Sequence, residues 1–88
     1  MGNFMGGSAW AMAQQIGEGF ILVSERTYKR LERVELEKLA FEMDKLLREV
    51  RAESHAIDDI SAIQQKQRKV TRLTGAISQL RSYQTRLR

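Results

Sequence analysis

The sequence predicts an all-α protein built on an antiparallel, coiled-coil-like hairpin of two helices, preceded by a short leader helix. Three observations support this. The chain has 88 residues, no proline, 42% hydrophobic and 30% charged residues, a composition typical of helices. Apolar residues recur every three or four positions along two long segments. The two segments fall out of a common heptad frame unless the chain folds back between them.

The first segment, residues 24–53, reads as one amphipathic helix. Ser24 is placed to cap it, and Glu25 puts negative charge in the first turn, where the helix dipole favours it. Its apolar residues share a stripe about 100° wide, the usual width of a buried helix face. The stripe consists of Tyr28, Leu36, Leu39, Met43, Leu46, Leu47 and Val50.

The second helix is expected over residues 59–87, after a turn at 54–58, with Asp58 or Asp59 as its cap. Ile77 lies one residue short of the heptad frame that Leu36 sets, so a single straight coil would lose its seam. A reversal near Ala56 restores the match. The resulting layers are Val50/Ile63, Met43/Val70 and Leu36/Ile77. Because no glycine or proline marks the bend, one continuous or bent helix is the alternative.

A hairpin of two helices leaves one flank of each apolar stripe in water, so we expect two copies to close a four-helix bundle as a homodimer. The chain has no cysteine for a disulfide, and self-association is another common way to stabilise so small a domain. The expected core and dimer seam is Leu36, Leu39, Met43, Leu46, Val50, Ile63, Val70, Leu73, Ile77 and Leu80.

Residues 1–23 form an apolar leader that holds five of the six glycines. Ser8 could cap a short helix that Gly17 and Gly19 end, with an extended connector at residues 20–23. No basic residue precedes the apolar run, so we do not expect a signal peptide, and polar residues interrupt the run, so we do not expect a membrane span. The absence of cysteine fits a reducing compartment, and we expect a cytoplasmic protein.

Val34 and Phe41 lie seven residues apart on the face opposite the main stripe of the first helix. Two interpretations are open. The leader could fold back and cover them with Trp10 or Phe20, or these apolar side chains could form a patch that docks a protein partner. The candidate partner-binding residues are Trp10, Phe20, Val34 and Phe41.

Positive charge is concentrated in the C-terminal helix. The formal net charge of the chain is +4, whereas residues 24–53 carry equal numbers of basic and acidic side chains. Arg68, Arg72 and Arg86 share the face opposite the seam, where they could contact a phosphate backbone or an acidic partner. A merely solvated outer face is the other interpretation, and no aromatic side chain is interleaved for base stacking.

Residues 20–32, FILVSERTYKRLE, locally resemble the strand-to-helix passage of Phd/YefM-type antitoxins, in which a short apolar strand runs into Ser, Glu and a Tyr-x-x-Leu helix start. The resemblance implies a strand at this point. The DNA-binding segment that precedes it in that family is not recognisable here. A basic hairpin that dimerises is also similar in architecture, by analogy alone, to Rop-like RNA-binding bundles.

No residue pattern predicts catalysis, a cofactor or a metal site. The single histidine, His55, shares one tight turn with Ser54 and Asp58, so the three side chains cannot converge on a substrate as a triad requires. We therefore expect a non-enzymatic interaction protein of regulatory or assembly type, acting on itself and on an unidentified protein partner. A nucleic-acid-binding regulator is the alternative, and a leader that anchors the protein to a membrane or assembly is a third reading.

Overall fold

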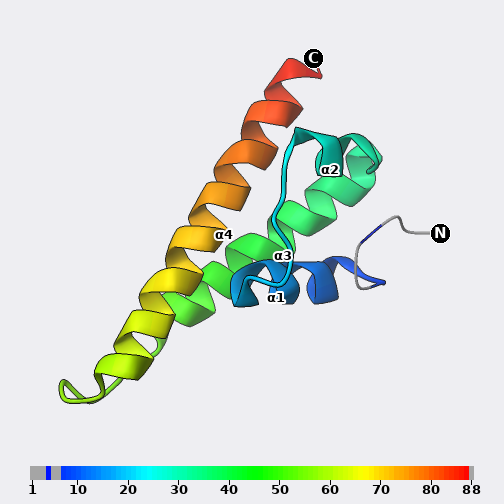
Figure 1. The fold of residues 1–88 in the computed structure, drawn as a ribbon. Coiled ribbons are helices and arrows are strands. Elements are labelled where there is room, and N and C mark those ends of the chain that lie inside the picture. The colour runs from blue at the N-terminus through cyan, green and yellow to red at the C-terminus, as the bar shows by residue number, and fades with distance from the viewer. Residues whose placement is uncertain (1–3, 5–6, 88) are drawn as a thin grey trace.

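The computed structural model describes residues 4 and 7–87, and within them the chain is all-helical, as the sequence predicts. The described part forms four helices and no strand (Figure 1). They are α1 (Ala9–Glu18), α2 (Glu25–Lys29), α3 (Arg33–Ala52) and α4 (Ile60–Arg86). Residues 1–3 and 5–6 of the predicted leader lie outside the described residues.

Helix α1 begins after the predicted Ser8 cap, but it continues through Gly17, which was expected to help end it, and ends at Gly19. The Ser8 side chain accepts a hydrogen bond from the backbone N–H of Ala11 at 3.1 Å, which satisfies a donor that the first turn leaves unpaired. Gly19 ends the helix with φ 84°, a left-handed conformation that favours glycine. Its N–H points back to the carbonyls of Gln15 and Ile16.

The continuous helix predicted from residue 24 to residue 53 is wrong, because the chain leaves helical conformation at residues 30–32. The Glu32 backbone N–H donates to Glu35 Oε1 at 2.9 Å, so Glu32 starts a new helix rather than continuing the old one. Leu31 is buried at the break. The interruption allows α2 to pack on α4 while α3 takes its own direction.

The chain also leaves helical conformation between Ala52 and Ile60, so one continuous rod is not what it forms. Asp59 caps α4, since its carboxylate accepts from the Ala62 N–H at 3.1 Å. After this loop α4 packs on α3, and the two helices diverge with distance from the loop (Figure 1). Divergence opens a groove that a third element can enter.

Helix α1 enters that groove and packs against both α3 and α4. Its buried face consists of Met12, Ala13, Ile16 and Gly17. A Cβ atom on Gly17 would lie 3.4 Å from Leu46 Cδ2 and 3.8 Å from Leu73 Cδ1, so the glycine brings the α1 backbone directly onto both helices. The leader therefore closes the core within one chain.

Tyr28 closes the other end of the same groove. Its side chain is fully buried, and its hydroxyl donates to the Ala76 carbonyl of α4 at 2.8 Å. Its ring lies 6.4 Å from that of Tyr83, centroid to centroid, in a tilted pair. Burial raises the pKa of the Tyr28 phenol above its usual value, since the charged form would lose its hydration.

Replacing Tyr28 with phenylalanine is expected to lower the free energy of unfolding by about 1 kcal/mol, since it removes one buried hydrogen bond while the ring still fills the core. Tyr28→Ala should cost about 3–5 kcal/mol, because it also leaves a cavity. Urea unfolding followed by circular dichroism measures both. Equal stability of wild type and Tyr28→Phe would show that the hydroxyl contributes nothing.

Wild type and Tyr28→Phe should also differ in how their folding stability depends on pH. The phenol of Tyr28 ionises near pH 10 in the unfolded chain and only at higher pH in the folded one, so folding stability is lost as pH rises above about 10. Tyr28→Phe has no phenol at this position and does not lose stability in this way. Its stability deficit against wild type should therefore shrink between about pH 9 and pH 11. A deficit that stays constant over this range would contradict the burial of the Tyr28 hydroxyl.

Candidate interaction surfaces

Basic side chains lie at the C-terminal ends of the three longer helices, each from another helix. Arg72 Nη1 donates to the Gly17 carbonyl of α1 at 3.1 Å, and Lys66 Nζ donates to the Glu53 carbonyl after α3 at 2.7 Å. Arg33 Nη2 donates to the Leu87 carbonyl after α4 at 3.3 Å. Cations are favoured there because the last carbonyls of a helix lack partners and carry partial negative charge.

Other cations of α4 pair with carboxylates on each of the remaining helices. Three contacts join them: Lys69 to Glu18 of α1 at 2.9 Å, Arg86 to Glu25 of α2 at 3.1 Å, and Arg81 to Asp44 of α3 at 3.4 Å. Such partly exposed pairs add little stability individually. Together they connect each of the other helices to α4.

The three arginines predicted to contact nucleic acid are thus not equivalent. Arg72 and Arg86 are held by partners within the chain. Arg68 is exposed, and no partner for it is found among the described residues. It lines a shallow surface depression with Gln64, Gln67, Thr71 and Arg72. The structure therefore does not present the three guanidinium groups as one unengaged basic face.

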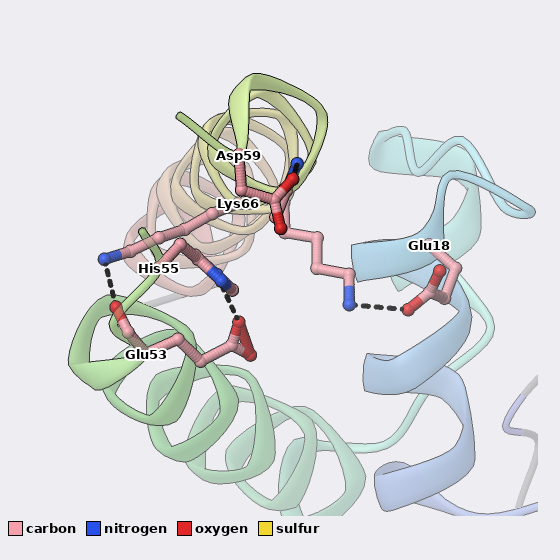
Figure 2. Close-up of polar contacts among 7 residues, drawn as sticks. Glu18, Glu53, His55, Asp59 and Lys66 are labelled. Atoms are coloured by element: carbon pink, nitrogen blue, oxygen red, sulfur yellow. Dashed lines mark hydrogen bonds and ion pairs between the residues drawn. The ribbon is translucent and has the colours of Figure 1, made fainter. Parts of the chain in front are cut away.

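The loop between α3 and α4 brings the lone histidine next to a carboxylate. His55 Nε2 lies 3.6 Å from Glu53 Oε2, and Lys66 crosses the same loop to reach the Glu53 carbonyl (Figure 2). Asp59 points into the first turn of α4, where it acts as the cap. These contacts stabilise the conformation of the loop. Among the described residues, Ser54 forms no hydrogen bond with His55.

The four predicted partner-binding residues are all exposed. Trp10 is 59% exposed, Phe20 79%, and Val34 and Phe41 60% each. The interpretation in which Trp10 or Phe20 covers Val34 and Phe41 is therefore wrong. The leader does fold back, but it buries Met12 and Ile16 against the opposite face of α3 instead. Val34 and Phe41 remain on the outer face of the molecule.

Phe41 stands beside a second groove, between α3 and the end of α4, which is open and is not the one that α1 fills. The groove is lined by Arg33, Leu36, Glu37, Ala40, Phe41, Asp44, Arg81, Gln84 and Leu87. Its walls combine apolar side chains with two basic and two acidic ones. Leu87 is itself partly exposed, so the groove offers an apolar strip with a charged rim. Sequence reasoning did not find the groove, because it depends on the divergence of α3 from α4.

The predicted dimer seam is mostly the interior of a single chain. Six of its members are buried within one copy: Leu36, Leu39, Met43, Val50, Leu73 and Leu80. Leu46, Val70 and Ile77 are partly buried and pack against that core, and Ile63 is partly exposed near the loop. These residues therefore act as core, and their role between two copies stays a prediction.

In the part of the chain that the structure describes, no helix is long and apolar enough to cross a membrane. Within the same residues, no three His, Cys, Asp or Glu side chains cluster as a metal site would need. Comparison of the chain with protein-family models, with curated proteins and with solved structures finds no match. The resemblance to Phd/YefM-type antitoxins stays local, and residues 21–24 form no strand here.

Gly19→Ala is expected to destabilise the protein more than Gly7→Ala. Both glycines have positive φ, which costs an alanine about 1–2 kcal/mol, but only at Gly19 would the new Cβ meet a neighbour, 2.7 Å from Arg72 Cζ. The guanidinium would have to leave the Gly17 carbonyl, for about 1 kcal/mol more. Urea unfolding tests this. In an Arg72→Met background the two substitutions should cost the same, and an unchanged difference would contradict the contact.

Proposed function

We propose that this protein is a small non-enzymatic interaction protein, of regulatory or assembly type, that docks another polypeptide on the outer face of α3. The observation that carries the proposal is the exposure of Val34 and Phe41, 60% each, on a chain whose core α1 and Tyr28 already close. Large apolar side chains left together on the outside of a small protein are typical of an interaction site.

In this proposal the hairpin of α3 and α4 is the scaffold and its outer face is the contact surface. A homodimeric four-helix bundle through Leu36, Met43 and Leu73 would require α1 to leave the groove. The outer face of α3 needs no such rearrangement, because its side chains face solvent while the opposite face holds the core. The nucleic-acid alternative has weaker support, since Arg72 and Arg86 are held within the chain.

A photoreactive phenylalanine analogue at position 41 tests the proposal in the cells that make the protein. We expect irradiation to yield covalent adducts with polypeptide, because a bound partner would lie within reach of this ring. The matched control carries the same analogue at Gln79, an exposed position on α4. Mass spectrometry identifies the adducts. Equal yields at both positions, or adducts with nucleic acid instead of polypeptide, would contradict the proposed function.

A further inference from the structure

Two acidic and two basic residues of α3 flank Phe41 on opposite sides of the helix. At 3.6 residues per turn, Glu37 and Asp44 lie roughly 40° and 60° to one side of Phe41 on α3. Lys38 and Lys45 lie roughly 60° and 40° to the other side. The acidic flank, Glu37 and Asp44, faces the groove with α4, which Arg33 and Arg81 also line, and Asp44 contacts Arg81 at 3.4 Å. The basic flank faces away from that groove.

Between the flanks runs an apolar line that begins at Val34, passes through Phe41 and continues along the aliphatic part of Arg48. All three side chains are exposed. The Arg48 guanidinium turns back toward its own helix, with Nε 3.5 Å from the Asp44 carbonyl. A helix laid on this line would meet one acidic and one basic flank along its sides.

A second α3 laid parallel to the first about a twofold axis satisfies both flanks. In this arrangement Phe41 meets Phe41 of the second copy, and the acidic flank of each helix faces the basic flank of the other. Glu37 faces Lys38 of the second copy, and Asp44 faces Lys45 of the second copy. The symmetry doubles each pair.

The antiparallel arrangement fails on the same residues. There the acidic flanks of the two helices face each other, so Glu37 meets Asp44 of the second copy, and Lys38 meets Lys45 of the second copy. Like charges placed opposite each other across an interface are unfavourable. The sign pattern therefore selects one orientation of a second copy out of two.

We infer that the outer face of α3 is an isologous interface at which a second copy of this chain binds in parallel, with Phe41 on the twofold axis. This rests on the proposed function and names the partner that the surface fits. It differs from the seam predicted from the sequence, because it uses the exposed side of α3 and leaves the core of each copy, α1 included, intact.

Charge-swap variants test the inference by sedimentation velocity on the full chain. We expect wild type to dimerise reversibly. Lys38→Glu/Lys45→Glu makes both flanks acidic, and Glu37→Lys/Asp44→Lys makes both basic. Each should raise the dimer dissociation constant at least about tenfold, whereas an equal mixture of the two variants should recover a mixed dimer near the wild-type affinity. Monomeric wild type, or a mixture no tighter than its components, would overturn the inference.

A variant that gains affinity guards against misfolding as an explanation. Arg48 brings like charges together across the axis, so Arg48→Leu should tighten the dimer at least about threefold by extending the apolar line. Unchanged affinity would count against the interface. Recovery in the charge-swap mixture requires that both variants fold, and circular dichroism confirms this for each variant alone.

Orientation has its own test, because the chain contains no cysteine. In the parallel dimer Val34→Cys lies opposite its counterpart and should oxidise to a disulfide-linked dimer. In an antiparallel dimer the two positions would be about 20 Å apart, at 1.5 Å per residue. Gln79→Cys on α4 is the control and should not cross-link. A wild-type monomer whose position 41 still cross-links to another polypeptide would overturn this inference and leave the proposed function standing.

Discussion

The fold depends on one packing constraint: two long amphipathic helices joined by a short loop cannot close a core by themselves. Helices α3 and α4 diverge from the loop, so their apolar faces line a groove. Helix α1 fills it, and Gly17 lets its backbone rest on Leu46 and Leu73. Burying this apolar surface within one chain stabilises a small domain that has no cysteine to form a disulfide.

Electrostatic contacts then fix the arrangement that apolar packing allows. The basic helix α4 places Lys66 at the end of α3 and Arg72 at the end of α1, while Lys69, Arg81 and Arg86 reach carboxylates on the other helices. Helix ends attract cations because their last carbonyls lack partners. The basic side chains of α4 therefore help to hold the helices together within one chain.

The sequence predicted much of this architecture and missed what depends on tertiary packing. Helical periodicity gave the helical class, and local chemistry identified Ser8 as a cap. Asp59 was one of two candidate caps for the second helix, and Gly19 was one of two glycines expected to end the first. The break before α3 was missed because Tyr28 and Leu36 fit one continuous stripe, whereas the contact of Tyr28 with Ala76 and the hydrogen bond from Glu32 to Glu35 favour separate helices. Within the leader, bulk suggested Trp10, whereas Met12 and Ile16 make the contact together with the smaller Ala13 and Gly17. Close approach selects small residues, which hydrophobicity alone does not rank highly.

The contacts of the candidate interaction residues also depend on tertiary packing, which the sequence alone does not give. The place of Phe41 opposite the stripe left two outcomes open, burial under the leader or exposure, and the groove beside it could not be predicted without the angle between α3 and α4. Arg68 and Arg72 look alike on a helical wheel. They differ in the structure because only Arg72 reaches the end of α1. Position on a helix face predicts exposure, whereas engagement depends on the element packed next to it.

The claim that α1 closes the core within one chain is tested most directly by hydrogen exchange with mass spectrometry at low protein concentration, where the chain is monomeric. Amide hydrogens in the last two turns of α1 should exchange together with those of α3 and α4, because one cooperative core holds all three. Exchange of the α1 amides at the rate of an unfolded peptide, while α3 and α4 stay protected, would contradict this account.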